Sequence, residues 1–211
     1  MGFDTFVARQ LRRPAGLVGR WWVGRSLNKT NGPLEDMGLE LMKLQPHHDV
    51  LEVGFGNGRL ISKMAGMVTE GSVTGIDISK TMVRQAARNN SGHIRSGRVK
   101  LVKASVEAIP AEEETFDRIF TANTIYFWPS PEDNIREVIR PLKKGGQFYC
   151  ALRLRKEMIQ MPVIHKNRQI FRNLFSRQEI RDFLEKAGFY NIQLHEKQGP
   201  RFADVIASGE K

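Results

Sequence analysis

The sequence predicts an α/β fold: a mostly parallel sheet of seven strands, with helices on both faces and an antiparallel hairpin at its C-terminal end. Short apolar runs alternate with amphipathic stretches from about residue 34 onward. Several of these runs are continuous and β-branched, which is typical of strands that helices cover on both faces. Alternation of strands and helices favours parallel strands joined by right-handed crossovers.

Seven segments are predicted to be strands, and the last two are expected to pair with each other. They cover Asp49–Val53, Val73–Asp77, Val99–Lys103, Arg118–Ala122, Gly146–Leu152, Asn191–Glu196 and Ala203–Ala207. Only Lys197–Arg201, which contains Gly199-Pro200, separates the final two. Because so short a connection cannot hold a crossover helix, we expect an antiparallel hairpin.

Three serines and one glycine indicate where helices between these strands begin and end. Ser79 is expected to cap the start of one helix, and Ser130, followed by Pro131 and Asp133, is expected to start another. Ser176 and Glu179 have the spacing of a capping box, and Gly188 is suited to end the helix that they begin.

Two basic segments lie outside this alternation. Residues 1–33 have a helical character that is interrupted around Pro14, and we expect them to form a basic N-terminal lid or cap. Residues 153–175 form a basic insertion in the domain that covers residues 34–211. Because ligands bind beyond the carboxyl ends of parallel strands, both segments are expected to wall a substrate pocket.

Positive charge is concentrated in parts of the chain. Lys and Arg outnumber Asp and Glu by 33 to 23, and residues 1–30, 80–103 and 153–172 hold the excess. Clustered positive charge favours an anionic partner, which leaves open an acidic substrate, an anionic membrane surface and nucleic acid. A basic surface that contacts only solvent is the alternative interpretation.

Cysteine usage and hydropathy limit the remaining possibilities. The single cysteine, Cys150, lies in an apolar run and is expected to be a buried structural thiol. No spacing of ligand residues indicates a metal site. No apolar run is as long as a membrane span, and the first residues lack the apolar core of a signal peptide. The sequence therefore predicts a cytoplasmic protein without a metal and gives no expectation of its oligomeric state.

The strongest local signal is Leu51–Ile61, where a buried strand runs into Gly54, Gly56 and Gly58 and a helix follows. Glycine permits positive φ and lets the backbone approach a ligand, and the new helix presents unpaired N–H groups. The pattern predicts a nucleotide-like ligand at this turn. A dinucleotide fingerprint ends in glycine or alanine where this chain has Arg59, which disfavours NAD.

Asp77 ends the second predicted strand, about 20 residues after the glycine turn. A carboxylate at that spacing can accept hydrogen bonds from both ribose hydroxyls of an adenosine. Turn and acid together favour an adenosine-containing ligand. In the alternative interpretation, Asp77 only caps the following helix.

With these motifs, the chain resembles the class I S-adenosylmethionine (SAM)-dependent methyltransferases over about residues 34–207, and among them the small enzymes related to the ubiquinone/menaquinone-biosynthesis methyltransferases. Glu52–Gly58 is similar to the family's first motif, E/D-x-G-x-G-x-G. Ala104–Pro110 and Leu142–Gly146 are similar to later ones. The resemblance implies a Rossmann-like fold, methyl transfer and SAM as cofactor. The residues implied to bind it are Glu52, Gly54, Gly56, Gly58, Asp77, Ile78, Met82, Ser105, Val106 and Asn123.

The resemblance also implies roles for these residues. The acid of the first motif holds the methionine end of SAM, and the glycines pass the sulfonium. Asp77 corresponds to the acid that binds the ribose, and Met82 to a side chain that packs on the adenine. Ser105 departs from the pattern, because an Asp often accepts a hydrogen bond from the adenine amino group at this position; a serine can still accept one.

The acceptor is expected to meet the methyl donor at Thr121–Trp128, after the fourth strand. Tyr126, Phe127 and Trp128 can wall an apolar or aromatic acceptor, or else close the core beneath the next helix. Tyr126 and His165 are the candidate catalytic residues, with His165, in the basic insertion, as the candidate base. Such a base is needed only when the attacking atom must lose a proton.

Three functions agree with these observations. The first is methylation of a hydroxyl, amine or carbon of a small hydrophobic acceptor, with an anionic acceptor favoured by the charge, by in-line displacement. The second is methylation of RNA or protein, which the net charge of +10 favours. The third is SAM binding without transfer, which only Ser105 suggests.

Overall fold

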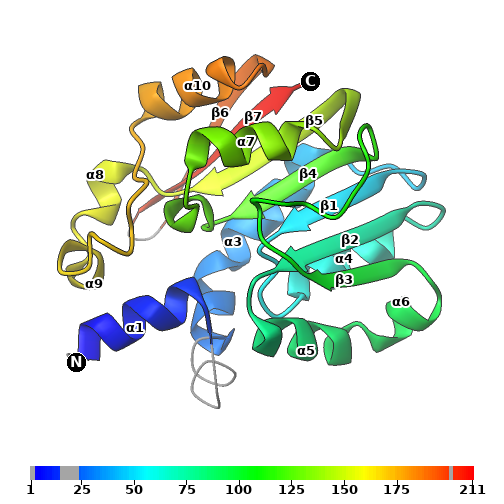
Figure 1. Ribbon diagram of the computed structural model, residues 1–211, viewed down its shortest axis with the longest axis horizontal. Helices are drawn as coiled ribbons and strands as arrows, with labels where there is room; N and C mark the ends of the chain where they lie inside the picture. Colours follow the sequence, from blue (N-terminus) through cyan, green and yellow to red (C-terminus); the bar gives the residue numbers. More distant parts are fainter. Residues whose placement is uncertain (1–2, 15–23, 200–201) are drawn as a thin grey trace.

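The computed structural model describes residues 3–14, 24–199 and 202–211, and a single seven-stranded sheet forms its centre (Figure 1). Its strands are β1 Asp49–Val53, β2 Ser72–Asp77, β3 Val99–Lys103, β4 Phe116–Ala122, β5 Leu142–Leu152, β6 Tyr190–Gln198 and β7 Ala203–Glu210. All seven predicted strands are confirmed. β5 begins earlier than expected because Leu142 pairs with Phe116 before a register shift in the two strands.

The strand order is β3-β2-β1-β4-β5-β7-β6, with β1 paired in parallel with both β2 and β4. β7 pairs antiparallel with both β5 and β6, which confirms the predicted hairpin and inserts its second strand next to the parallel part of the sheet. The strand order reverses between β1 and β4. In open α/β sheets, ligands bind beyond the carboxyl ends of the strands at such a reversal.

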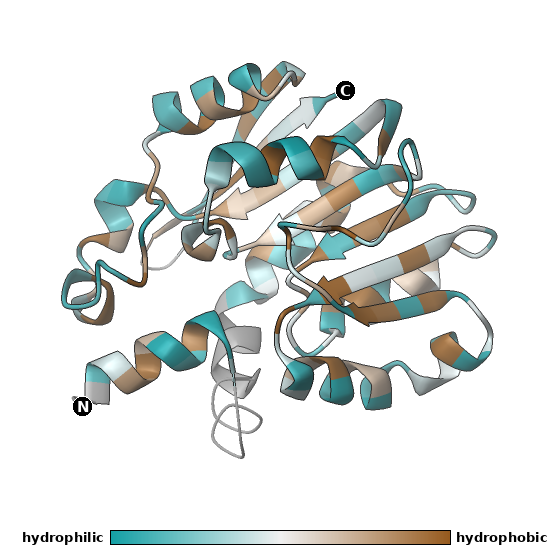
Figure 2. Cartoon of the chain, in the orientation of Figure 1, coloured by the Kyte–Doolittle hydropathy of each residue, from teal (hydrophilic) through white to brown (hydrophobic). Residues whose placement is uncertain are grey.

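Helices cover both faces of this sheet, as predicted (Figure 1). One face carries α3 Gly24–Met42, α4 Arg59–Met67 and α5 Lys80–Asn89, with the short α6 Ser91–Arg95 after them. The other carries α7 Pro131–Ile139 and α10 Arg177–Lys186. Hydrophilic and hydrophobic bands alternate along α5, α7 and α10 in Figure 2, the pattern of helices with one face on a core.

Strand residues alternate between two hydrophobic cores. Ile119 and Phe148 belong to the core beneath α7 and α10, whereas Phe120 and Tyr149, the next residues along, belong to the core beneath α3 and α4. Successive side chains of a strand point to opposite faces, so a strand covered on both sides has no polar face. Cys150 is fully buried, which confirms a structural thiol, and burial raises its pKa to about 12.

The three helix starts predicted at serines are confirmed. Ser79 Oγ accepts a hydrogen bond from the Met82 N–H at 3.3 Å. Ser176 and Glu179 form the predicted capping box before α10. Ser130 precedes α7, with Pro131 at its first position, but the Ser130 side chain makes no cap; its own N–H instead donates to Asn134 Oδ1 at 3.2 Å.

The two basic segments lie side by side. α1 Phe3–Arg12 packs against α9 Pro162–His165, which follows α8 Arg155–Met158, and the Lys166–Asp4 ion pair joins them with an N–O distance of 2.8 Å. α3 continues across the boundary expected after residue 33, and residues 15–23 of the expected lid lie outside the described residues. Among the helices of the described ranges, none is long and apolar enough to cross a membrane.

The caps give a matched test of local stability. Ser176→Ala removes a side chain that accepts from the Glu179 N–H, which should cost about 1 kcal/mol and lower Tm by roughly 2–4 °C. Ser130→Ala removes no such bond, so its Tm should stay near that of the wild type. Thermal unfolding of both variants checks this expectation, and an equal fall in Tm would contradict the assignment of the caps.

Candidate active site

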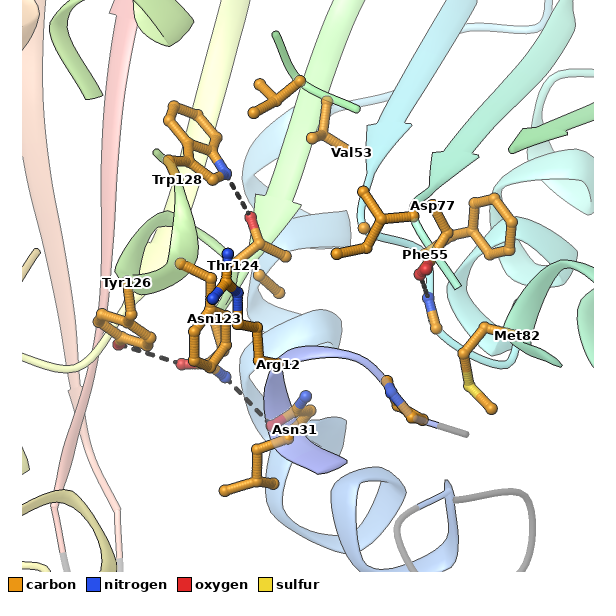
Figure 3. A pocket seen from close by; sticks show the side chains of 18 of the residues that line it. Arg12, Asn31, Val53, Phe55, Asp77, Met82, Asn123, Thr124, Tyr126 and Trp128 are labelled. Carbon is orange, nitrogen blue, oxygen red and sulfur yellow. Dashed lines mark hydrogen bonds between the residues drawn. The ribbon is translucent and has the colours of Figure 1, made fainter. Parts of the chain in front are cut away.

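A pocket of about 460 Å³ lies beyond the carboxyl ends of β1, β2 and β4 (Figure 3). Its wall comes from the turn after β1, the end of β2, the loops after β3 and β4, and both basic segments. Twelve of the residues predicted for the site line it: Glu52, Gly54, Gly56, Asp77, Ile78, Met82, Ser105, Val106, Asn123, Tyr126, Phe127 and Trp128. Two others, Gly58 and His165, do not.

The glycine turn presents backbone to the pocket at Gly56. This residue has a φ of 54°, and a Cβ added to it would meet no protein atom within 4 Å. The space beside it is therefore part of the pocket. A ligand can approach the backbone there as the sequence predicted, and any side chain would project into the ligand's space.

Gly54 and Gly58 have the positive φ predicted for glycines of this turn, 79° and 76°, and each also makes room for a neighbouring element. A Cβ on Gly54 would lie 2.3 Å from Thr124 Cγ2, so this glycine lets the loop after β4 pack on the turn. A Cβ on Gly58 would lie 2.7 Å from the Ala86 Cβ, so this glycine lets α5 approach. Gly58 is buried away from the pocket wall, and only its backbone supports the turn: Asn90 Nδ2 donates to its carbonyl at 2.9 Å.

Asp77 joins the end of β2 to this turn. Its Oδ2 accepts a hydrogen bond from the Gly56 N–H at 2.9 Å, and its Oδ1 accepts one from the Ser79 N–H at 2.7 Å. Burial raises the pKa of Asp77 to about 6, although the two backbone donors act in the opposite direction. The alternative interpretation, an Asp that only caps the next helix, is incomplete, because the carboxylate also lines the pocket.

Glu52, at the end of β1, presents an unsatisfied oxygen. It is buried, and its Oε2 has no hydrogen-bond partner among the described residues. Burial raises its pKa well above the usual range, and the neighbouring carboxylates of Glu35 and Asp77 raise it further. Glu35 lies on α3 and accepts from Arg59 Nε at 3.0 Å. This end of the pocket therefore carries more carboxyl groups than cations can neutralise, which suits a cationic ligand.

Ser105 and its neighbours form the side of the pocket between the ends of β2 and β3. Met82 and Val106 are buried apolar residues of the wall, and they can contact a flat ring on either side. The Ser105 hydroxyl donates to Glu107 Oε2 at 2.8 Å and also accepts from the Glu107 N–H at 3.3 Å. Ser105 is thus engaged in a local turn, which weakens its prospects as an acceptor for a ligand.

Asn123 follows β4 in an unusual conformation. Its φ is 55°, a left-handed value that costs energy for any residue except glycine and is more tolerable for Asn. Its Nδ2 donates to Asn31 Oδ1 at 3.1 Å, and its Oδ1 accepts from the Tyr126 hydroxyl at 3.2 Å (Figure 3). The strained backbone therefore holds the amide between α3 and the loop after β4, on the pocket wall.

Tyr126 is a poor candidate for a catalytic base. It is buried, and its hydroxyl oxygen accepts from the Arg153 N–H. Burial raises its pKa well above the ordinary value near 10, so it stays protonated at neutral pH. His165, the candidate base, does not line the pocket. It is exposed at the end of α9, and the preceding residue, Ile164, is the one that reaches the pocket.

Trp128 is fixed by a chain of hydrogen bonds that leads to β1. An indole N–H can only donate, and it donates to Thr124 Oγ1 at 3.2 Å. Thr124 Oγ1 lies 2.5 Å from Thr121 Oγ1, and the Thr121 hydroxyl itself donates to the Val53 carbonyl at 2.8 Å. Each hydroxyl has one proton, so Thr124 must be the donor to Thr121. The indole plane is thereby anchored to the sheet.

The far end of the pocket is apolar. Its wall combines aromatic and aliphatic side chains from both basic segments and from the loop after β4: Val7, Leu11, Phe127, Met158, Met161, Ile164 and Phe171. Two cationic side chains, Arg12 and Arg153, line the same pocket. No group of acidic, His or Cys residues in the described ranges could hold a metal ion.

Some residues of this wall were missed by reasoning from the sequence. Asn31 and Glu35 of α3 both line the pocket, and Phe171 closes its apolar end. A signal existed for the first two, because polar residues four positions apart share one face of a helix. None existed for Phe171, since only the folded chain brings the segment after α9 to the loop after β4.

Comparisons with known proteins agree on one family, the methyltransferases. The family model described as a methyltransferase domain matches residues 51–150. The uncharacterized methyltransferase YdaC of Bacillus subtilis is 30% identical over 162 residues, which are 77% of this chain and 82% of that protein. The 2-methyl-6-phytyl-1,4-hydroquinone methyltransferase 1 of Oryza sativa subsp. japonica is 32% identical over 114 residues, covering 54% of this chain and 33% of that protein.

A solved structure shows the same fold. It is that of a SAM-dependent methyltransferase from Aquifex aeolicus, with a TM-score of 0.70 and 21% identity. The match covers 89% of this chain and 97% of that one.

The open space at Gly56 leads to a first prediction for this site. Gly56→Val should weaken SAM binding by more than about 100-fold, because its side chain fills space that the ligand needs. Gly97→Val is the matched control, because Gly97 has a φ of 77° and equally open surroundings but lies outside the pocket. Both substitutions strain the backbone, by about 1–2 kcal/mol. Calorimetry on the two folded variants checks the prediction, and equal SAM affinities would show that the turn does not face the cofactor.

Asp77 leads to a second prediction for this site. Asp77→Asn removes a charged acceptor and should cost about 1.5–3 kcal/mol of SAM binding, or roughly 10- to 150-fold in Kd. Ser105→Ala, which removes a neutral hydroxyl already used by Glu107, should cost about 1 kcal/mol or less. Equal losses in the two variants would mean that the ribose is held elsewhere.

The same carboxyl sets a pH dependence. Asp77 has a pKa near 6 without ligand, and ribose hydroxyls donate best to its ionised form, so SAM affinity should rise with pH. If only the ionised form binds, the gain between pH 5 and pH 7 is about tenfold. Asp77→Asn should flatten the part of this rise that is centred near pH 6, whereas Ser105→Ala should keep it. A rise that is unchanged in Asp77→Asn would assign it to another group.

Proposed function

The chain belongs to the SAM-dependent methyltransferases, and on that premise we propose that it methylates a hydroxyl, amine or carbon of a small hydrophobic acceptor, preferably an anionic one, by in-line displacement. As an enzyme of this family it uses SAM as its cofactor. The observation that carries the proposed acceptor is the division of the pocket into an end with buried carboxyl groups and an apolar end.

The carboxyl end has the groups that SAM needs. Glu52 Oε2 is a buried acceptor without a partner, and an ammonium group would satisfy it. Gly56 leaves space for a ligand to pass along the backbone. Asp77 offers a carboxylate to ribose hydroxyls, while Met82 and Val106 offer an apolar slot for a flat base. The methionine and adenosine parts of SAM would thus be bound on the two sides of the glycine turn.

The apolar end is where we place the acceptor. SAM supplies a methyl group on a sulfonium, an activated electrophile with a neutral thioether as leaving group. The protein's own residues position the acceptor and exclude water: Trp128 is held by its hydrogen-bond chain, and Phe127, Ile164 and Phe171 form a dry wall. Orientation of two bound reactants can supply much of the rate enhancement of a displacement of this kind.

The acceptor is best methylated when the electron pair with which it attacks is already available. Histidine is absent from the described wall of the pocket, and burial keeps the Tyr126 hydroxyl protonated. A nucleophile such as an amine, or an oxygen that is acidic in solution, needs no protein base to attack. Arg12 favours an acceptor with a negative charge, since it lines the same pocket; Arg153 lines it too but forms an ion pair with Asp204 at 3.8 Å.

The rice relative supports a hydrophobic acceptor, because its name specifies a hydroquinone with a phytyl chain. It matches only part of that protein's length, so the support concerns the class of acceptor. Methylation of RNA or protein is the alternative, favoured by the exposed basic residues of α5, α6 and β3. A pocket whose acceptor end is walled by apolar side chains offers less to a nucleotide or a charged peptide.

Transfer of a labelled methyl group from SAM tests the proposal. A panel of small apolar phenols, amines and carboxylic acids should yield product, whereas bulk tRNA and histone should not. Met161→Gln places an amide in the apolar wall and should raise the KM of the acceptor about 5- to 30-fold, from a cost of about 1–2 kcal/mol. Its effect on the Kd of SAM should be small.

Met67→Gln is the matched control, because Met67 is exposed at the end of α4. It should leave both constants unchanged. Product from tRNA alone, or a Met161→Gln protein that loses SAM affinity while acceptor KM stays constant, would contradict the assignment of the apolar end.

A further inference from the structure

We propose that the outer face of α1, α8, α9 and the segment after them binds membranes that contain anionic phospholipid. We call this surface the docking face and define it by five exposed basic residues, which are Arg9, Arg13, Lys156, Arg168 and Arg172. The inference rests on the proposed function in one respect only, that a hydrophobic acceptor reaches the pocket from this side.

The segments that form the docking face contribute little acidic charge, although Glu196 of β6 lies close enough to Lys156 for the lysine to help lower its pKa. The described part of α1 contains one acid, Asp4, which is paired with Lys166 at 2.8 Å. Residues 153–172 also contain one acid, Glu157, and it is buried. Basic side chains exposed on adjoining helices attract a surface of anionic lipid head groups, and each contributes to the attraction.

Two large apolar side chains are exposed on the same face. Phe6 on α1 is 39% exposed, and Ile159, between α8 and α9, is 43% exposed. They lie on elements that adjoin through the packing of α1 against α9. Apolar side chains among basic ones on surface helices are the arrangement with which amphipathic helices enter the boundary between head groups and acyl chains.

A second basic surface provides an internal comparison. Arg84, Arg88, Arg95, Lys100 and Lys103 are also exposed, on α5, α6 and β3. Among the described residues, no large apolar side chain of residues 80–103 is exposed to a similar extent. Charge alone would therefore not distinguish the two surfaces, whereas insertion of apolar side chains favours the docking face. Nucleic acid, which presents no apolar layer, would not use Phe6 and Ile159 in this way.

The docking face is also the outer side of the acceptor end of the pocket. Val7 and Leu11, on the inner side of α1, line the pocket, and so do Met161 and Ile164 beside α9. The same helices thus separate the apolar cavity from the surface that would contact lipid. A hydrophobic acceptor dissolved in a membrane would have a short path to the pocket without crossing water.

Vesicle co-sedimentation tests the proposal. The probe is phosphatidylcholine vesicles with and without phosphatidylglycerol, at low and high salt. Wild-type protein should bind the vesicles with phosphatidylglycerol and be released from them by salt, since exposed charges are screened within about 10 Å at 0.1 M. The docking variant changes all five basic residues to Gln: R9Q, R13Q, K156Q, R168Q and R172Q. Its binding should fall at least about tenfold.

The control variant changes the same number of charges on the other surface: R84Q, R88Q, R95Q, K100Q and K103Q. It has the same net charge as the docking variant, and it should bind the vesicles nearly as well as the wild type. A third variant, Phe6→Ser with Ile159→Ser, should bind several-fold more weakly at unchanged charge. Equal losses in the two charge variants, no binding of the wild type to anionic vesicles, or binding to single-stranded RNA alone would overturn the docking face.

Calorimetry with SAM on the same proteins separates this outcome from that of the proposed function. Loss of vesicle binding with intact SAM binding in the docking variant supports the docking face. Vesicle binding by a wild-type protein that fails to bind SAM would leave the docking face standing and refute the proposed function instead.

Discussion

The hydrogen bond from the Gly56 N–H to the Asp77 carboxylate is the contact on which the site depends, because it joins the ends of β1 and β2 at 2.9 Å. β1 and β2 are in register up to Val53 and Ile76, and the Gly54 N–H still donates to the Ile76 carbonyl at 2.8 Å beyond that point. The turn is therefore held to the sheet from its first residue. At Gly56, the space that a Cβ would occupy remains open to the pocket.

Two buried carboxyl groups beside this turn make the empty site electrostatically unfavourable. Burial raises the pKa of Asp77 from 3.8 to about 6, and that of Glu52 rises for the same reason. A raised pKa in an acid means that the folded state holds its proton to higher pH than the unfolded chain. The contribution of Asp77 to stability therefore falls as pH rises from about 4 through 6. A ligand with a cationic amine and ribose hydroxyls offsets this cost, so the site is organised for SAM at some expense to the free protein.

Much of the fold could be predicted from the sequence, because its signals are local. β-Branched runs, the capping box at Ser176 and the short Gly199-Pro200 connection each specify one element or junction, and all seven strands followed from them. Residues of the pocket wall could also be predicted, since Glu52 and Asp77 lie at strand ends that the topology brings together. The packing role of two of the glycines could not be predicted, because Gly54 and Gly58 also make room for residues distant in the chain.

The apolar end of the pocket was less predictable for the same physical reason. Its wall is assembled from α1, the segment around α9 and the loop after β4, and no periodicity within one segment reports which side chains meet there. His165 and Ile164 are neighbours in the sequence, yet helix geometry directs the isoleucine to the pocket and leaves the histidine exposed. The imidazole of His165 suggested a base from the sequence alone, whereas only the packing of the folded chain shows that Ile164 lines the pocket.

The crystal structure of the protein with S-adenosylhomocysteine would test the central claim most directly. The account predicts the ribose hydroxyls on the Asp77 carboxylate, the amino group within hydrogen-bond distance of Glu52 Oε2, and the ligand against Gly56 with its sulfur toward the apolar end. An adenosine bound elsewhere, with Glu52 Oε2 still lacking a partner, would contradict it.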